Sequence, residues 1–223
     1  MESVFDYSSF FDFPGCSAYF INDHSTTFED RSALVNFVGL SPNKIVIPNQ
    51  VHSANIAVVH DHALPIDTDG IVTTKPGLVL TIQVADCIPV YFADPKKRII
   101  GLVHAGWRGI SKGILLEAVN QFKALGSRIS PVKVLFGPSI RQCCFEVKND
   151  VLHHFPVACI HNDNRNRYWI DLQLYATQQL VKSGIHISNI SNDSQCTCHN
   201  NEYQSYRRDG EKAGRMIAVM SFS

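Results

Sequence analysis

The sequence lacks a charge imbalance and lacks any long apolar run. Its 223 residues contain 20 Lys and Arg against 20 Asp and Glu, so the formal net charge is zero. Proteins that bind nucleic acid or acidic membrane surfaces usually carry a basic excess, so we expect neither partner. No stretch approaches the roughly 18 consecutive apolar residues of a membrane-spanning helix. We therefore expect no membrane span.

The sequence also lacks the features of a secreted, disulfide-bonded protein. Its first residues show neither the basic region nor the apolar region of a signal peptide. The seven cysteines are odd in number, and Cys143 and Cys144 are adjacent, which makes a poor structural bridge. These features predict reduced thiols in the cytoplasm, where a cysteine is more often buried, metal-binding or nucleophilic.

Common local motifs are missing as well. There is no GxGxxG, GxxxxGK[ST], HExxH or GxSxG. The pair Cys196 and Cys198 has neither the PCxxC spacing of cytidine-type deaminases nor the spacing of a zinc knuckle. The chemistry, if there is any, must come from residues that meet only in the folded protein.

Apolar segments of strand length are plentiful. About 45% of the residues are apolar, enough for a sizeable core, and we expect a single domain over residues 1–223. Several runs are continuously apolar, which is typical of strands buried on both faces. We expect strands at 44–47, 55–59, 78–85, 99–103, 132–136, 185–190 and 216–222.

Two helices are indicated clearly and a third more weakly. Apolar residues recur at helical spacing over 110–125, before Gly126. Asp171 can cap a helix that runs to about 183, and a shorter helix fits 148–154. The elements do not alternate regularly between strand and helix. The prediction is an α/β fold with a mixed sheet and helices packed outside it, not a Rossmann fold.

Three reactive side chains follow or lie between apolar strand candidates. Cys87 follows the run from residue 78, His104 follows the run from 99, and His52 lies in a turn. If the first two strands are neighbours, these side chains can meet at one sheet edge. Two imidazoles and a thiolate suit zinc and leave a position open. The same residues also allow a metal-free hydrolase, with Cys87 as nucleophile, His104 as base, and Asp86 or Gln50 assisting.

Arginines mark candidate anion sites. Arg108 lies in the segment HAGWRG at 104–109, beside the positive end of the predicted helix. Arg207 and Arg208 follow Tyr206, and such a group can clamp a phosphate and stack on a base or sugar. Ser139 lies in a turn after the strand at 132–136 and could contact a ligand. Each of these residues also has a purely structural interpretation.

Together these segments resemble one known family. In its order, the chain carries QVH at 50–52, DG at 69–70, ADCIPV at 85–90, HAGWRG at 104–109, GPSI at 137–140, FEV at 145–147 and SYRRD at 205–209. The resemblance covers about residues 45–215 and is to the laccase-domain, or multicopper polyphenol oxidoreductase, family. Members of that family have been reinterpreted as zinc-dependent purine nucleoside phosphorylases, with adenosine deaminase and methylthioadenosine phosphorylase activities.

The resemblance implies a site and a reaction. His52, Cys87 and His104 would hold zinc, with copper as an alternative occupant, in a layered α/β sandwich similar to toxin-type cysteine hydrolases. The substrates would be phosphate and a purine nucleoside such as adenosine, inosine or methylthioadenosine, and the zinc could activate water for deamination. We expect Asp86 and Arg108 to act in catalysis. We expect the substrate to contact Gln50, Ser139, Arg207 and Arg208.

One segment departs from the family pattern. Family members usually carry a Gly-rich, Arg-containing segment near the N-terminus, but residues 19–27 contain no glycine. If that segment binds phosphate or ribose, the substrate range here differs. Two further alternatives are a copper-dependent phenol oxidoreductase and a protein in which the metal only braces the fold. A trinuclear copper centre needs several His-x-His pairs, and the chain has one, at His60 and His62.

Overall fold

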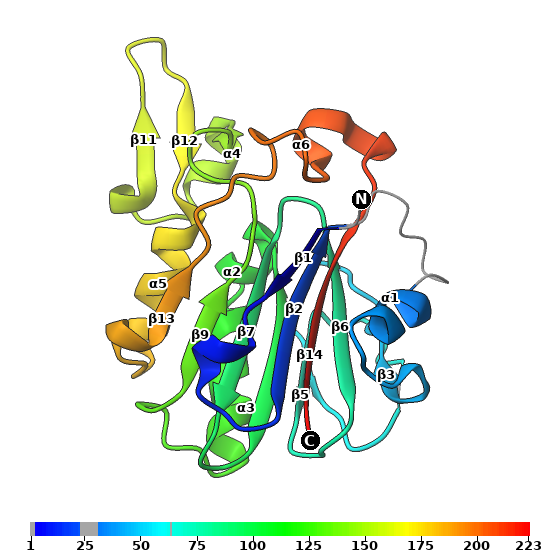
Figure 1. Ribbon diagram of the computed structural model, residues 1–223. Coiled ribbons are helices and arrows are strands. Elements are labelled where there is room, and N and C mark those ends of the chain that lie inside the picture. The colour runs from blue at the N-terminus through cyan, green and yellow to red at the C-terminus, as the bar shows by residue number, and fades with distance from the viewer. Residues whose placement is uncertain (1–2, 23–30, 63) are drawn as a thin grey trace.

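Two β-sheets stacked face to face form the centre of the protein (Figure 1). The computed structural model describes residues 3–22, 31–62 and 64–223. The five-stranded sheet has the order β1-β2-β14-β6-β3, with bounds Ser3–Asp6, Cys16–Asn22, Met216–Phe222, Val79–Val84 and Ile45–Val46. Within it only β3 and β6 are parallel.

The second large sheet has six strands. Its order is β13-β9-β7-β8-β5-β4, with bounds Ile190–Asn192, Lys133–Phe136, Ile88–Asp94, Ile99–Ala105, Gly70–Thr73 and Ile56–Val58. The two outermost pairs are parallel and the inner pairs are antiparallel. A small antiparallel sheet has the order β10-β12-β11, with bounds Glu146–Val147, Tyr168–Ile170 and Ile160–Asn162.

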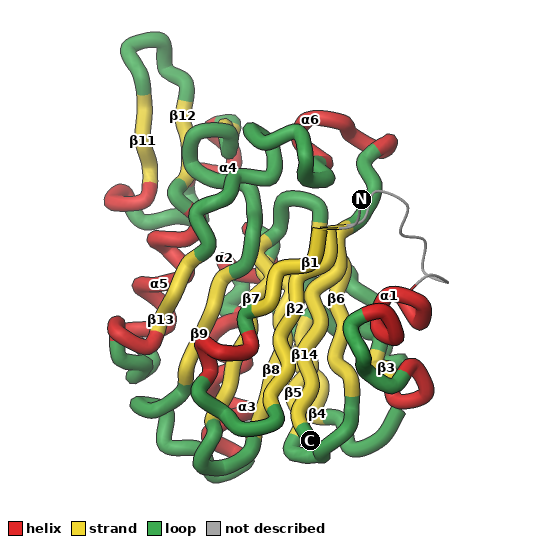
Figure 2. The backbone as a smooth tube through the Cα atoms, in the orientation of Figure 1, coloured by secondary structure: helices red, strands yellow, loops and turns green. Residues whose placement is uncertain are grey.

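Helices lie around the sheets (Figure 2). The α-helices are α1 Arg31–Phe37, α2 Trp107–Ser111, α3 Ile114–Ala124, α4 Asn149–Leu152, α5 Leu172–Lys182 and α6 Tyr206–Asp209. Short 3₁₀ helices span Ser8–Phe11, Pro42–Lys44, Val157–Cys159, Ile187–Asn189 and Gly210–Lys212. Among the described residues, no helix has the length and apolar character needed to cross a membrane.

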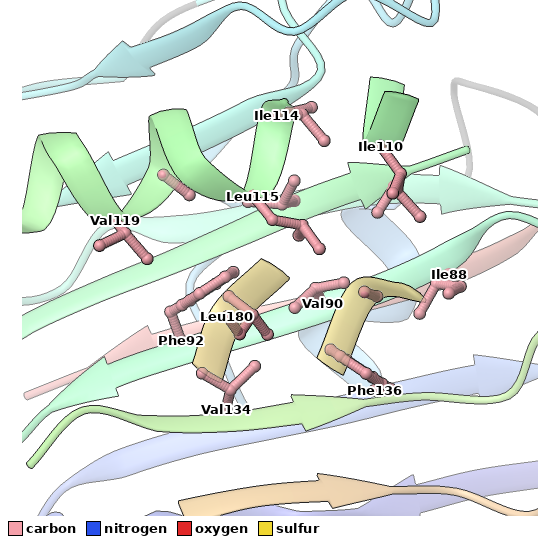
Figure 3. Packing of buried hydrophobic residues seen from close by; sticks show 14 of the residues in the cluster. Ile88, Val90, Phe92, Ile110, Ile114, Leu115, Val119, Val134, Phe136 and Leu180 are labelled. Carbon is pink, nitrogen blue, oxygen red and sulfur yellow. The ribbon is translucent and has the colours of Figure 1, made fainter. Parts of the chain in front are cut away.

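Strand β7 shows why the central strands read as continuous apolar runs. Side chains alternate between the two faces of a strand. Val90 and Phe92 of β7 pack with α3 and α5 in one apolar cluster, whereas Tyr91 and Ala93 face the five-stranded sheet in another. Figure 3 shows Val90 and Phe92 packed against Leu115 and Leu180. Both faces are buried, so polar alternation is absent.

The layers follow from three apolar clusters. One fills the space between the two sheets, and a second joins the six-stranded sheet to α2, α3 and α5. The third joins α1, through Leu34 and Val35, to the outer face of the five-stranded sheet. The order is therefore helix, sheet, sheet, helix, and the predicted layered mixed α/β fold is confirmed, with its strands divided between stacked sheets.

Most of the predicted elements are present, with two corrections. The expected helix over 110–125 is two helices, because Gly113 adopts φ 89° between α2 and α3. The expected strand at 185–190 is wrong: the His186 ring accepts a hydrogen bond from the Ser188 N–H and starts a 3₁₀ helix, and the strand begins at Ile190. Among the described strands, β1, β2, β5, β7, β10, β11 and β12 were not predicted.

One half-buried side-chain hydrogen bond ties the two sheets together, and removing it should lower stability. The Tyr91 hydroxyl on β7 donates to the Tyr19 carbonyl on β2 at 2.7 Å. Tyr91→Phe should reduce the free energy of unfolding by about 1–2 kcal/mol, because a half-buried acceptor loses its donor. Urea unfolding measures the change. The control is Tyr168→Phe on β12, whose hydroxyl makes no hydrogen bond within the described part of the chain; equal losses would contradict the account.

Candidate metal centre

The candidate site lies where the chain passes from one sheet to the other. Strand β6 ends at Val84 in the five-stranded sheet, and β7 begins at Ile88 in the six-stranded sheet. The strands β6 and β8, which lead to Cys87 and His104, are therefore stacked and are not hydrogen-bonded neighbours. The prediction assumed that these two strands are neighbours in one sheet, and that assumption is wrong. Both residues still reach one edge, because Ile88, next to Cys87, pairs with Ala105, next to His104.

The structure brings His52, Cys87 and His104 together. Their nitrogen and sulfur atoms lie within 4.8 Å of one another. The two imidazole rings have centroids 4.9 Å apart and an interplanar angle of 69°. His104 is buried, Cys87 is half-buried and His52 is exposed, so the group is open on one side. This donor set fits a zinc site with an open position.

Gly106 is required by space at this point. A Cβ atom there would lie 2.8 Å from the Cys87 sulfur and 3.1 Å from Cδ2 of His52. Its backbone, at φ −74° and ψ 163°, is accessible to any residue. Glycine is therefore needed because the three side chains fill the volume, and not because of the backbone conformation.

Asp69 positions two of the three side chains. It is fully buried, and its Oδ1 lies 2.8 Å from Nδ1 of His104 and accepts the His52 N–H at 2.9 Å. Its Oδ2 accepts the N–H of Ser53 at 2.6 Å and the Ser53 hydroxyl at 2.8 Å. A carboxylate on Nδ1 fixes the ring and leaves Nε2 for a metal. It also holds His52 at φ 58°, a conformation that is costly for this residue.

The charges of the site support each other. Burial opposes ionisation of Asp69, but hydrogen bonds from His104 and Ser53 outweigh it and hold the pKa of Asp69 well below its usual range. Burial also acts against charge on Cys87 and His104. Their mutual attraction and hydrogen bond nevertheless lower the pKa of the Cys87 thiol and raise the pKa of His104. A thiolate is the form of cysteine that binds metals.

A cavity of about 730 Å³ lies against these residues. Four arginines line it, namely Arg31, Arg108, Arg207 and Arg215, and among the described residues Asp86 is the one acidic residue in its lining. Arg108 is exposed, with Cζ 4.6 Å from the centroid of the Trp107 ring. No carboxylate of the described residues lies within 4.0 Å of its guanidinium. The cavity therefore suits an anionic ligand.

Two of these arginines were not predicted. Arg31, at the start of α1, is 2% exposed, and burial lowers its pKa to about 10. Its Nη1 donates to the Thr81 hydroxyl at 3.2 Å. Arg215 donates to the carbonyls of Ala213 and Gly214. Neither arginine lies in a local motif, so only the tertiary structure brings them to the cavity.

Other predicted residues line the cavity with their side chains partly engaged. The Arg207 guanidinium donates to the carbonyls of Cys144 and Glu146, at 3.2 and 2.7 Å. Gln50 bonds through its amide to the backbone N–H and carbonyl of Gln83, both at 2.8 Å. Gln50 thus fastens the loop that carries His52 to β6.

Asp86 lies beside Cys87 at φ 85°, an uncommon conformation for this residue. Its carboxylate accepts hydrogen bonds from the hydroxyls of Thr197 and Ser205 and from the Arg207 N–H. These contacts favour a positioning role for Asp86 over a role in proton transfer.

Arg208 and Ser139 do not line the cavity. The Arg208 guanidinium pairs with Asp209 and donates to backbone carbonyls, including those of Thr197 and Tyr203. Ser139 is fully buried and accepts from the Gln173 amide. Both therefore brace loops in this structure. Of the segment 19–27 that departs from the family pattern, residues 23–27 lie outside the described part of the chain.

Asp69→Asn should weaken metal binding while leaving the fold intact. The amide keeps the size of the side chain but loses the charge that orients His104, and such partners typically contribute 10- to 100-fold, roughly, in metal affinity. Competition with a zinc chelator measures the change. Asp67→Asn is the matched control, because Asp67 is exposed and Asn also tolerates its φ of 49°. Equal zinc affinity in wild type and Asp69→Asn would show that Asp69 does not support the site.

The chain is similar to known proteins in sequence and in fold. A purine nucleoside phosphorylase of Corynebacterium glutamicum is 31% identical over 209 residues, which cover 89% of this chain and 82% of the relative. Adenosine deaminase RL5, from an unknown prokaryotic organism, is 30% identical and covered to 82%, over 88% of this chain. The crystal structure of YlmD from Geobacillus stearothermophilus matches with a TM-score of 0.87 at 26% identity, over 94% of this chain and 93% of that one.

A family model described as multi-copper polyphenol oxidoreductase laccase matches residues 11–223. This span includes His52, Cys87, His104 and every residue that lines the cavity. The predicted resemblance is confirmed, and the chain belongs to the multi-copper polyphenol oxidoreductase laccase family.

Proposed function

We propose that this protein is a purine nucleoside phosphorylase that cleaves adenosine, inosine or methylthioadenosine with phosphate, and that it also deaminates adenosine. The observation that carries the proposal is the cavity in which four arginines face the group His52, Cys87 and His104. The names of the relatives agree with both reactions. A volume of about 730 Å³ is in the range of small-molecule sites.

Phosphorolysis needs an anion held next to the sugar. An oxygen of hydrogen phosphate forms a bond to the anomeric carbon while the bond from that carbon to the purine breaks. The bonding electrons leave with the purine, and the proton lost by the phosphate balances the proton that the purine gains. The products are a free purine and ribose 1-phosphate, or methylthioribose 1-phosphate from methylthioadenosine. The protein must therefore bind a phosphate and stabilise negative charge on the leaving base.

Arg108 is the best placed residue for the phosphate. It is exposed within the cavity, no carboxylate of the described residues lies within 4.0 Å of its guanidinium, and it follows His104 by four residues. The Arg207 guanidinium donates hydrogen bonds to the carbonyls of Cys144 and Glu146, and it has further N–H donors for the substrate. Trp107, Phe145 and Tyr206 give the cavity aromatic surface for a purine.

His52, Cys87 and His104 are proposed to hold zinc, with copper as an alternative occupant. Bound there, the metal would supply Lewis acidity beside the cavity. Deamination replaces the amino group at C6: a water oxygen bonds to C6 and the C6–N bond breaks. One water proton passes to the amino group, which leaves as ammonia, and the other passes to the purine ring. Because Asp69 holds Nδ1 of His104, the other ring nitrogen, Nε2, would be left to bind the metal. Because residues from Arg31 to Arg215 build one cavity, we also propose that the chain acts as a single domain.

Arg108→Ala should weaken phosphorolysis more than deamination, because only phosphorolysis binds an additional anion. A charged hydrogen-bonding group contributes about 1.5–3 kcal/mol, which is about one to two decades in rate or affinity. The measurement is the ratio of adenine to inosine formed from adenosine at several phosphate concentrations. Arg128→Ala, which changes an exposed arginine outside the cavity, is the control.

Two results would contradict this prediction. An unchanged product ratio in Arg108→Ala would assign Arg108 a structural role. Failure of fully metallated wild-type protein to form adenine at any phosphate concentration would overturn the phosphorylase proposal itself.

A metal-free Cys–His hydrolase is the second candidate, because Cys87 and His104 lie within reach of each other. The two functions differ in what chelation does to Cys87. A zinc-bound thiolate should react slowly with iodoacetamide and become reactive after chelation, whereas a free nucleophile should react at the same rate in both states. Mass spectrometry of the peptide containing Cys87 reports its labelling. Fast labelling without chelator would favour the hydrolase.

The structure gives less support to a trinuclear copper oxidase. The described residues contain two groups of three His, Cys, Asp or Glu side chains close enough to share a metal, and neither includes His60 or His62. The Nδ1 atom of His62 lies against the Ile45 carbonyl instead.

A further inference from the structure

Three sulfur atoms converge near the turn that follows Ile140, a residue of the cavity lining. Cys143, Cys144 and Cys196 place their Sγ atoms within 4.8 Å of one another, and those of Cys143 and Cys144 are 3.7 Å apart. The first two lie in the turn after Ile140, and Cys196 comes from a segment that pairs with Ser139 in an isolated bridge. Residues more than 50 positions apart thus present three thiols to one point.

The surroundings of Cys196 favour a thiolate. Cys196 is 9% exposed, and the Arg141 N–H donates to its sulfur at 3.4 Å. Burial raises the pKa of this thiol, but backbone hydrogen bonds from Arg141 and His199 outweigh burial and lower it. Cys143 is exposed and Cys144 is half-buried, so a metal ion can reach the cluster from the surface of the protein.

We propose that Cys143, Cys144 and Cys196 form a second, thiolate-rich metal site that binds zinc and has a structural role. Three sulfur ligands select soft or borderline cations, and structural zinc sites are built mainly from cysteine. Cys198 follows Cys196 by two residues in the same segment and is the candidate for a fourth ligand. This inference does not depend on the proposed reaction.

A metal explains the cluster better than a disulfide does. A disulfide uses two sulfurs and leaves the third unused, and the adjacent Cys143 and Cys144 are poorly placed to bridge each other. A single cation can engage all three. The local spacing of Cys196 and Cys198 resembles no zinc motif, so the sequence alone did not indicate the site.

The position of the cluster suggests what the metal would do. The Cys144 carbonyl accepts from the Arg207 guanidinium, and the Cys198 carbonyl accepts from Arg208. Thr197, which lies between Cys196 and Cys198 in the sequence, donates a hydrogen bond from its hydroxyl to the Asp86 carboxylate. A metal that joins the 143–144 turn to the 196–198 segment would therefore fix the wall that carries Arg207 into the cavity.

The test is the zinc content of matched cysteine variants purified with zinc and dialysed. Wild type should hold about two zinc ions per chain, with Cys87→Ser and Cys196→Ser each holding about one. Cys159→Ser is the control and should hold about two, because Cys159 is buried elsewhere, against Gln178. A Cys87→Ser protein that binds no zinc would overturn the proposal.

A second measurement covers the case in which Cys196→Ser does not fold. Cys87→Ser reconstituted with cobalt(II) should keep a strong thiolate-to-metal charge-transfer band, since three or four thiolates remain at the cluster and only one was removed. Absence of that band would contradict the site. Peptide mass spectrometry of wild type prepared without reductant is the third readout: a disulfide within the cluster would replace the metal proposal with a redox one, whereas free thiols agree with it.

Discussion

The site depends on one buried carboxylate. Asp69, at the entry to β5, bonds to the His104 ring on β8 and to three successive backbone N–H groups, those of Val51, His52 and Ser53. A buried carboxylate without partners would be costly, and these donors satisfy it. The same bonds determine where the ligands lie: one imidazole is oriented, and the loop that carries the other is held in a strained conformation. Asp69 therefore joins the His52 loop to the six-stranded sheet.

The stacked sheets then determine what the three side chains can reach. The connection from β6 to β7 crosses between the sheets and carries Asp86 and Cys87 at the crossing. Asp86 faces the C-terminal segment and binds Thr197, Ser205 and the Arg207 backbone, while Cys87 faces the histidines. One pair of adjacent residues thus couples the candidate metal centre to the cavity wall that presents Arg207. Gly106 leaves the space in which the three side chains meet.

The sequence pointed to the candidate metal ligands and to Arg108, but not to the residues that hold them in place. His52, Cys87, His104 and Arg108 could be nominated because reactive residues follow apolar runs and occur in the order of a known family. The strands around them are buried on both faces, so their apolar runs identified β3, β4, β6, β8, β9 and β14, but neither the remaining described strands nor the division into two sheets. Asp69 was not predicted as a site residue, because its role depends on hydrogen bonds to residues 16 and 35 positions away in the sequence. Arg31 and Arg215 reach the cavity only through tertiary structure. Arg208 looked like a phosphate clamp, but its donors are used by Asp209 and by nearby carbonyls.

The central claim is that Asp69 presents His52, Cys87 and His104 as one metal site. Anomalous X-ray scattering on either side of the zinc absorption edge, from crystals of zinc-loaded protein, tests it most directly. We expect an anomalous peak that marks a zinc ion bonded to the Cys87 sulfur, to a nitrogen of His52 and to Nε2 of His104. Nδ1 of His104 should keep its hydrogen bond to Asp69. Zinc found only elsewhere in a crystal grown with excess metal, with this group left unbound, would contradict the account.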